Sequence, residues 1–324
     1  MILHVTIRTF SARTYVPTIN MTKISKTIKI SLQHEEWLKS KQINFSEWIR
    51  TKLDEEIRQK RVDREGEKFK AVILAAGKDK NLFPLTEDIP KTLLDIKGKT
   101  ILERQIDMLR SVGINSIAVV RGYKKERIDF PNLAYFDNDD YENTGILVSL
   151  FTAREFMDVN TIVLYGDILF GTDILKKLME IQNDTTLVVD RGWQKRYQVG
   201  QEGHPFPPEL TTLSEKGQEI RINAVGVNIS ETNSTSEFIG LARLSGNACS
   251  ILRDIYKNVY CVDQDRKFHN AEHMRKASFV DFIQELLNQG EKVSALEIWR
   301  TWIDIDTFED YRSAWKSYNT IAAC

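Results

Sequence analysis

The carboxylates and the lysine that could do chemistry stand beside apolar segments of the sequence. Asp167 ends the run TIVLYGD, Asp304 and Asp306 lie in WIDIDTFEDY, and Lys91 follows a proline in PKTLLDI. Mg²⁺ prefers oxygen ligands and is usually held by one or two carboxylates together with substrate phosphates. A lysine beside such a site stabilises the negative charge that grows on a phosphate in a transition state. These residue types indicate phosphate chemistry assisted by Mg²⁺, although a single aspartate at a strand end more often forms a turn.

The stretch AVILAAGKDKNLFPLTEDIPKTLLDIKGKTILE is the most specific in the chain. It resembles the opening signature of nucleotidyltransferases that activate sugar phosphates and related alcohols. The resemblance implies that Lys91 is the catalytic lysine, Asp167 the first metal ligand, and Asp304 with Asp306 the second acidic pair, in which Asp306 is the more direct ligand. A triphosphate has to lie against backbone N–H groups, which requires a close turn that carries glycine. The residues expected to cradle the base and the first phosphates are Leu74, Ala75, Ala76 and Gly77.

The chain departs from this signature directly after Gly77. Where the signature reads L-A-A-G-x-G-[ST]-R-L, this sequence has Asp79, Lys80 and Asn81 before the last leucine. The arginine that clamps the triphosphate is therefore replaced, and a carboxylate stands near the expected position of the phosphates. We expect Lys78 or Lys80 to supply positive charge there, although a lysine does not reproduce the paired contacts of an arginine.

Two further segments resemble parts of compact relatives that act on phosphocholine and phosphonates. In YENTGILVSLFTARE the polar residues expected to contact the nucleotide are Asn143, Thr144 and Ser149. In VVDRGWQKRY and EFIGLARLS the acceptor-binding candidates are Asp190, Trp193, Arg196, Tyr197 and Glu237. Aromatic side chains there would face an ammonium group, and Arg196 would hold an anionic head group. The alternative is that Trp193 and Tyr197 only pack a loop.

Elements that alternate between buried strands and amphipathic helices must position these residues. Residues 69–77, 116–122 and 161–167 are rich in Val, Ile and Leu without alternation, which indicates strands that are buried on both faces. Helices expected over residues 102–113 and 147–157 connect them, which predicts a right-handed, mostly parallel sheet. The fold class is therefore α/β and Rossmann-like, and the resemblance implies the nucleotide-diphospho-sugar transferase fold. The nucleotidyltransferase domain is predicted over residues 69–318, with its ligands at the carboxyl ends of the strands.

Residues 21–62 carry a separate pattern. Isoleucines alternate with polar residues over residues 24–31, which predicts a strand, and helices are expected over residues 33–41 and 46–60. A unit of this size is too small to be a stable monomer, so we expect a homodimer. The phrase INFSEWIR resembles the ribbon-helix-helix family, which implies a two-stranded ribbon that reads DNA; a module that only dimerises is the alternative. The outward ribbon residues would be Ser25, Thr27 and Lys29.

Composition sets further limits. The 324 residues carry a formal net charge of −1, which argues against a polyanion binder over the whole chain. The three cysteines are far apart, which fits the reducing cytoplasm, and no apolar run approaches the roughly 20 residues that cross a bilayer. Residues 1–20 are expected to be a loose tail, because the patterned sequence begins at Met21.

Together these patterns predict a Mg²⁺-dependent nucleotidyltransferase. The resemblance favours transfer of a cytidylyl group from CTP to a small phosphonate or phosphate-alcohol acceptor, with release of pyrophosphate. One alternative is a sugar-1-phosphate nucleotidyltransferase that uses UTP or dTTP. Another is a ribbon-helix-helix regulator that binds DNA and whose large domain only senses a nucleotide.

Overall fold

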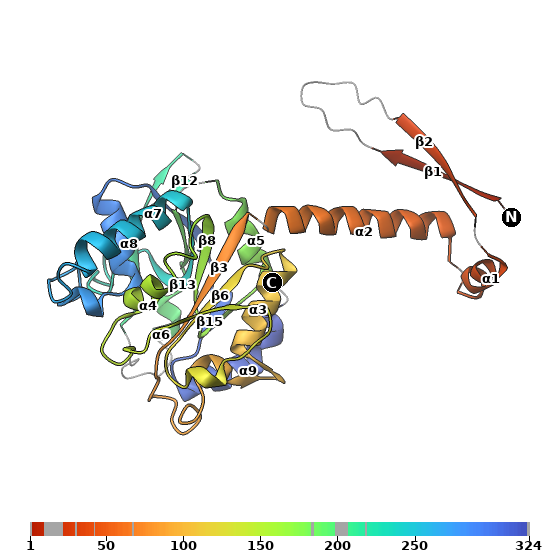
Figure 1. Ribbon diagram of the computed structural model, residues 1–324. Coiled ribbons are helices and arrows are strands. Elements are labelled where there is room, and N and C mark those ends of the chain that lie inside the picture. Colours follow the sequence, from red (N-terminus) through yellow and green to blue (C-terminus); the bar gives the residue numbers. More distant parts are fainter. Residues whose placement is uncertain are drawn as a thin grey trace. The chain divides into compact units, whose positions relative to one another are not determined.

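The computed structural model describes residues 2–9, 22–29, 31–41, 43–66, 68–182, 185–197, 207–217 and 219–322 (Figure 1). The chain divides into two compact units, Met1–Asp63 and Arg64–Cys324. No helix in the described ranges is long and apolar enough to cross a membrane.

The first unit consists of a β-hairpin and two helices. Strands β1 (Ile2–Thr9) and β2 (Thr22–Lys29) pair antiparallel. Helices α1 (Leu32–Ser40) and α2 (Phe45–Gly66) follow. The Ser31 side chain accepts a hydrogen bond from His34 N at 3.3 Å, and Asn44 Oδ1 accepts one from Glu47 N at 3.2 Å. Both bonds satisfy backbone donors that the first turn of a helix leaves open, so these residues set where the helices begin.

The expected loose tail over residues 1–20 is wrong for Ile2–Thr9, which forms β1; residues 10–21 lie outside the described residues. Strand β1 supplies a backbone partner for one edge of β2, with His4 opposite Thr27. Pairing of two copies of β2 across a two-fold axis would therefore have to use the other edge of β2. The order strand, helix, helix is present over residues 22–66, and the ribbon-helix-helix dimer stays a prediction.

The second unit is built on a nine-stranded sheet whose strand order is β10-β14-β12-β11-β13-β8-β3-β6-β7. Its strands are β3 (Phe69–Ala75), β6 (Ile117–Arg121), β7 (Ala134–Asp137), β8 (Asn160–Tyr165), β10 (Thr185–Asp190), β11 (Leu210–Lys216), β12 (Glu219–Gly226), β13 (Ser236–Leu244) and β14 (Val293–Ile298). Short pairs are formed by β4 (Asp95–Ile96) with β5 (Lys99–Thr100) and by β9 (Ile168–Phe170) with β15 (Trp302–Asp304). The helices are α3 (Ile101–Ser111), α4 (Ile146–Thr152), α5 (Thr172–Glu180), α6 (Gln194–Tyr197), α7 (Gly246–Ile255), α8 (Phe279–Asn288) and α9 (Phe308–Ala322).

The parallel part of the sheet runs β7-β6-β3-β8. The chain moves outward from β3 to β6 and β7, and then returns to β8 on the other side of β3. Such a reversal is the switch point at which α/β sheets bind ligands, beyond the carboxyl ends of the strands. The sequence prediction of β3, β6 and β8, and of α3, which Gly113 terminates at a φ of +87°, is confirmed.

Beyond β8 the sheet is mostly antiparallel, contrary to the prediction, and β10 with β14 is the parallel pair among its described strands there. Strand β13 pairs antiparallel with β8 and with β10, and β11 and β12 form an antiparallel hairpin. A short hairpin turn can connect only antiparallel strands, and β11 and β12 are too close in sequence for a crossover helix. The sheet is therefore mixed, and its antiparallel half forms one wall beside the switch point.

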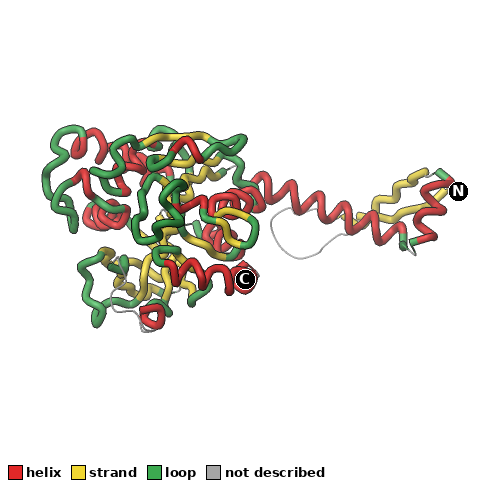
Figure 2. Tube along the Cα trace, turned by 90° about the horizontal axis from the view of Figure 1, so that it is seen from below, coloured by secondary structure: helices red, strands yellow, loops and turns green. Residues whose placement is uncertain are grey.

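Two apolar layers cover the sheet, with helices on both of its faces (Figure 2). Val72 and Leu74 of β3 belong to the layer that includes residues of α4, α7 and α8, whereas Ala71 and Ile73 belong to the layer with α3 and α5. Alternate side chains of β3 thus enter opposite layers, as expected for a strand buried on both faces. A third, smaller cluster, which includes Leu82, lies under the loop that follows β3.

Candidate active site

Lys91 is held by the loop that links β3 to a 3₁₀ turn at Lys91–Leu93. Leu82 anchors this loop in the third apolar cluster and is 1% exposed. The Thr86 hydroxyl donates to the backbone oxygen of Asp79 at 2.6 Å, which closes the loop on itself. Tyr123 N donates to Ala76 O at 2.9 Å, which ties the start of the loop to the end of β6. The loop is therefore fixed at several points before its lysine enters the site.

Asp167 stands in the tight turn between β8 and β9. Gly166 N donates to Leu74 O at 2.9 Å, and a Cβ added at Gly166 would lie 2.8 Å from that oxygen, so only glycine permits this approach. The Gln105 amide donates to Tyr165 O at 2.8 Å and to Ile168 O at 2.9 Å on the two sides of the turn. Gln105 is fully buried in α3, and it fixes the backbone that presents Asp167.

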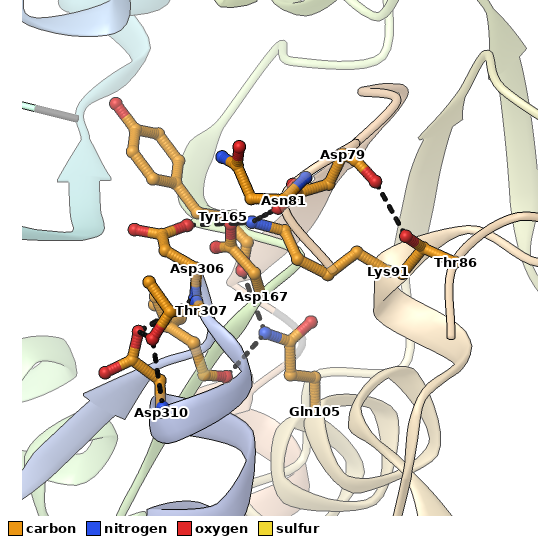
Figure 3. Close-up of polar contacts among 11 residues, drawn as sticks. Asp79, Asn81, Thr86, Lys91, Gln105, Tyr165, Asp167, Asp306, Thr307 and Asp310 are labelled. Carbon is orange, nitrogen blue, oxygen red and sulfur yellow. Dashed lines mark hydrogen bonds and ion pairs between the residues drawn. The ribbon is translucent and has the colours of Figure 1, made fainter. Parts of the chain in front are cut away.

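Asp306 enters the site from the C-terminal part of the chain. Their spacing of two residues predicts that Asp304 and Asp306 share one face of a strand. This prediction is wrong, because β15 ends at Asp304 and Asp306 lies two residues beyond the strand. Asp310 Oδ2 accepts hydrogen bonds from Asp306 N at 3.3 Å and Thr307 N at 2.9 Å at the start of α9. This capping arrangement, rather than strand pairing, holds Asp306 in place (Figure 3).

Three carboxylates converge on the Lys91 ammonium (Figure 3). Lys91 Nζ lies 2.8 Å from Asp167 Oδ2, 2.8 Å from Asp306 Oδ1 and 2.9 Å from Asp79 Oδ2. Burial of the ammonium lowers the pKa of Lys91, but the charges of the three aspartates outweigh this effect and raise its pKa overall. Lys91 therefore carries a full positive charge at neutral pH.

The first cavity lies beyond the carboxyl ends of β3 and β8, where a nucleotide was expected. The predicted nucleotide-binding residues that line it are Leu74, Ala75, Ala76, Gly77, Lys78, Thr144 and Ser149. Lys80 and Asn143 are exposed and are not among the residues that line it in the described structure. Lys78 Nζ lies 3.2 Å from Glu142 Oε1, so of the two lysines offered in place of the arginine, Lys78 is the one at this cavity.

Asn138, Tyr141 and Thr92 belong to this region but carried no signal in the sequence. Tyr141 and Thr92 line the first cavity. The Asn138 amide, 5% exposed, donates to Thr144 Oγ1 and to Ser149 Oγ at 2.9 Å each. Asn138 therefore orients two hydroxyls of the cavity, a role that depends on contacts between β7 and α4 that spacing does not reveal.

The second cavity adjoins the first, and Lys91 and Asp167 line both. Asp304, Asp306 and Glu237 line its walls. Among the described residues that line this wall, carboxylates outnumber lysines, and aromatic side chains stand beside them, namely Tyr165, Phe238 and Trp302. The second cavity thus suits a ligand that ends in a positively charged group.

The other acceptor candidates lie elsewhere. Asp190 is 3% exposed; its Oδ1 accepts from Gly192 N at 2.8 Å and Arg300 N at 2.9 Å, and its Oδ2 accepts from Trp302 Nε1 at 3.0 Å. Trp193 is also buried, at 3% exposed. Neither is among the described residues that line the two cavities, so their positions fit a packing role. The side chains of Arg196 and Tyr197 lie outside the described residues.

Glu209 is a lining residue of the second cavity that the sequence did not single out. Burial raises the pKa of the Glu209 carboxyl to about 8, and the nearby carboxylates of Asp281, Glu237 and Asp167 add to this rise. Tyr165 Oη donates to Glu209 Oε2 at 2.9 Å, and burial raises the pKa of Tyr165 as well. The wall of the second cavity therefore carries a carboxyl group that is largely protonated at neutral pH.

The donor set fits a divalent cation that a nucleotide would bring with it. No group of three or more His, Cys, Asp or Glu side chains within the described ranges forms a complete metal site. Asp167 and Asp306 nevertheless each place one carboxylate oxygen 2.8 Å from Lys91 Nζ, so the two carboxylates converge at this position. In addition, Asp167 Oδ1 is buried and has no hydrogen-bond partner among the described residues. Two carboxylates with phosphate oxygens form the ligand set that Mg²⁺ usually adopts.

Comparisons with known proteins agree with this geometry. A MobA-like NTP transferase domain matches residues 71–220, which contain the β3 loop, Lys91 and Asp167. The UTP–glucose-1-phosphate uridylyltransferase AglF of Haloferax volcanii is 32% identical over 172 residues, which cover 48% of this chain and 69% of that protein. The chain belongs to the MobA-like NTP transferase family. It is a nucleotidyltransferase.

Within the family, the similarity to a second relative extends over more of the chain. The CTP:phosphoglutamine cytidylyltransferase of Campylobacter jejuni is 29% identical over 253 residues, which cover 74% of this chain and 96% of that protein. Two solved structures share the fold. The inositol-1-phosphate CTP transferase from T. maritima has a TM-score of 0.59 at 18% identity, over 79% of this chain and 98% of that one. The CTP:phosphocholine cytidylyltransferase from Streptococcus pneumoniae has a TM-score of 0.57 at 20% identity, over 78% and 99%. The nucleotide-diphospho-sugar transferase fold of the second unit is thereby confirmed.

Proposed function

We propose that this nucleotidyltransferase transfers a cytidylyl group from CTP to a small acceptor that bears a phosphate or a phosphonate, and releases pyrophosphate. The observation that carries the proposal is the position of Lys91 and Asp167, which line both cavities. A group transferred from one cavity to a ligand in the other has to pass this point. The choice of CTP rests on the relatives, whose names specify cytidylyl transfer or CTP in three cases.

The reaction requires positioning more than covalent chemistry by the protein. The glycine loop from Leu74 to Gly77 would bind the nucleotide through backbone N–H groups. An acceptor oxygen in the second cavity, already anionic at neutral pH, attacks the α-phosphorus; a P–O bond forms to the acceptor while the bond to the pyrophosphate oxygen breaks. Lys91 donates hydrogen bonds to the α-phosphate, where negative charge grows. Because reactants held in line react faster than free ones, the two adjoining cavities supply much of the rate.

Mg²⁺ is the cofactor that we propose for this reaction. Asp167 and Asp306 would hold it, because they fit a hard cation and Asp304 lies at the wall of the same cavity. When bound, the ion neutralises charge on the α-phosphate and stabilises the displacement.

The second cavity favours an acceptor with an ammonium group opposite its phosphate. Lys91 would meet the anionic end. The Glu237 carboxylate and the ring of Phe238 line the region in which the other end would lie. Cations bind favourably to carboxylates and to aromatic faces.

An alternative acceptor class is suggested by the uridylyltransferase relative. AglF acts, by its name, with UTP on glucose 1-phosphate. A neutral sugar would leave the acidic wall of the second cavity without a charged partner, which disfavours this alternative.

We also propose that the first unit forms the contact of a homodimer. Trp37 is 50% exposed, Leu53 40% and Ile57 65% on its helices. Burial of apolar side chains against a second copy removes them from water. Ile57→Glu should then convert a dimer in analytical ultracentrifugation to a monomer, whereas an unchanged mass would contradict the proposal. DNA binding by the same unit is a separate prediction, which a salt-dependent mobility shift would test.

The decisive experiment for the proposed reaction is a panel of four NTPs against phosphocholine, 2-aminoethylphosphonate and glucose 1-phosphate, with Mg²⁺. Pyrophosphate release should be fastest with CTP and an acceptor that carries an ammonium group. Asp167→Asn should reduce the rate at least about a hundredfold. Asp173→Asn should not, because Asp173 is a partly exposed aspartate on α5 that is not among the described residues lining either cavity. Release of pyrophosphate with no pair, alongside salt-sensitive binding to one DNA sequence, would favour the regulator instead.

A further inference from the structure

Asp79 is a buried carboxylate at the position where the family signature has its second glycine. Its Oδ2 lies 2.9 Å from Lys91 Nζ, and 6% of its side chain is exposed. Its Oδ1 accepts a hydrogen bond from Asn81 N at 2.8 Å, and its backbone oxygen accepts one from Thr86 Oγ1 at 2.6 Å (Figure 3). These two contacts hold Asp79 independently of the lysine, so its carboxylate is a fixed anchor.

The three acidic partners approach Lys91 from different sides. In the described lining of the cavities, Asp79 belongs to the first and Asp306 to the second, while Lys91 and Asp167 belong to both. A lysine ammonium has three N–H donors. Asp306 Oδ1 accepts a hydrogen bond from Lys91 Nζ at 2.8 Å, whereas Asp79 Oδ2 accepts no hydrogen bond within the described residues and contacts the ammonium as an ion pair at 2.9 Å. An α-phosphate that approaches Lys91 therefore competes with three carboxylate oxygens that lie within 2.9 Å of its ammonium nitrogen.

Asp167 and Asp306 are the carboxylates that fit the proposed cation, and the inference rests on that proposed function. A cation held by Asp167 and Asp306 would repel the Lys91 ammonium, because two positive charges beside the same carboxylates repel strongly in a partly buried site. Lys91 then needs a partner that the cation does not use. We propose that Asp79 is a positioning residue, which keeps the Lys91 ammonium on the nucleotide side of the site when Asp167 and Asp306 bind the cation.

If Asp79 did not position Lys91, its removal would have the opposite effect on the enzyme. Next to a triphosphate it would only repel the ligand, so its removal would tighten nucleotide binding and leave turnover unchanged or faster. If Asp79 positions Lys91, its removal leaves the nucleotide in place but misdirects the ammonium. Removal of Asp79 then lowers kcat and leaves KM nearly unchanged.

The test is Asp79→Asn, which removes the charge and retains the oxygen that accepts from Asn81 N. The control is Asp88→Asn on the same loop, whose side chain is 80% exposed and pairs with Lys124 at 3.5 Å. With CTP, Mg²⁺ and the acceptor that is active in the panel, Asp79→Asn should lower kcat by about tenfold and change the KM for CTP by less than about threefold. Asp88→Asn should match the wild type. A lower KM with undiminished kcat in Asp79→Asn would overturn the inference.

A double-mutant cycle separates action through Lys91 from general damage to the loop. In a Lys91→Met background, Asp79→Asn should have no further effect on kcat, because the group that it positions is already gone. Independent, multiplicative losses would overturn the inference. If Asp79→Asn does not fold, Asp79→Gly, which restores the residue of the family signature, should show the same loss and the same coupling.

A structural measurement does not depend on turnover. In a complex with Mg²⁺ and the α,β-methylene analogue of CTP, Lys91 Nζ should stay within about 3.5 Å of Asp79 and lie farther than that from Asp306. An ammonium that remains on Asp306 would overturn the inference and leave the proposed function intact. A wild-type chain with no activity in the panel would instead remove the proposed function itself.

Discussion

Replacement of Lys91 by methionine should destabilise the fold as well as the reaction. Lys91 Nζ lies 2.8 to 2.9 Å from three carboxylate oxygens, and its side chain is 15% exposed. Because each oxygen lies so close to the ammonium nitrogen, any two of these oxygens are separated by at most twice that distance. Removal of the ammonium leaves their negative charges next to one another unless the site opens. Two unit charges about 5 Å apart repel by about 3 kcal/mol at an effective dielectric constant of about 20.

Movement of side chains and entry of water will relieve part of this repulsion. Removal of one partner from a buried ion pair destabilises proteins by about 3–5 kcal/mol, and we expect Lys91→Met to fall in this range. Urea unfolding at pH 7 would measure the loss. Lys177→Met is the matched control, because Lys177 is 63% exposed and pairs with Asp173 on the surface, and such pairs contribute at most about 1 kcal/mol.

The cause of the loss can be tested by its rescue. Millimolar Mg²⁺ should stabilise Lys91→Met more than it stabilises the wild type, since the cation replaces the missing positive charge and no ammonium competes with it. Asp79→Asn added to Lys91→Met should recover part of the loss. A Lys91→Met protein as stable as the wild type, with no response to Mg²⁺, would refute the convergence of the three carboxylates on this lysine.

Three further predictions concern residues around the site. Glu209→Gln should become more stable relative to the wild type as the pH rises from about 4.5 to 8. The pKa of Glu209 is raised from 4.5 to about 8 in the folded protein, so the folded wild type retains a proton that its unfolded chain loses, which costs the wild type at most about 5 kcal/mol of stability. A constant difference in thermal unfolding between the two proteins across this pH range would contradict the prediction. Gln105→Leu, which removes two hydrogen bonds to the turn at Asp167, should lower kcat with little change in KM, and an unchanged kcat in steady-state kinetics would remove Gln105 from this positioning role. Asp190→Ala, which leaves three donors without an acceptor, should lower the free energy of unfolding by about 2–4 kcal/mol, and a variant as stable as the wild type in urea would show that this network is dispensable.

Much of the fold and the centre of the site could be predicted from local sequence patterns. The apolar run that ends at Gly77 and the run that ends at Asp167 lie on adjacent parallel strands, and the carboxyl ends of parallel strands meet at one edge of a sheet. Lys91 was identified by its motif. Its contact with Asp306, 215 positions later in the chain, depends on the pairing of β9 with β15, which no spacing encodes.

Asp190 and Asp79 each have a partner from a distant part of the chain that their local sequence does not show. Asp190 was an acceptor candidate because its segment resembles the acceptor-side segment of relatives, yet the fold brings the backbone of Arg300 and the indole of Trp302 to it from a distant segment. Asp79 looked like an obstacle to phosphate binding, because its charge was considered without its partner Lys91. In both cases a long-range contact decides the role of a charged residue, and local patterns do not contain that contact.

The most direct test of the central claim is the single-turnover rate of nucleotidyl transfer by the wild type and by Lys91→Met, at saturating CTP and Mg²⁺ and at a temperature where circular dichroism shows both proteins folded. We expect a product that carries one nucleotidyl group, and a rate of transfer in Lys91→Met at least about a hundredfold lower than in the wild type. A variant rate within about threefold of the wild type would contradict the assignment of Lys91 to the α-phosphate.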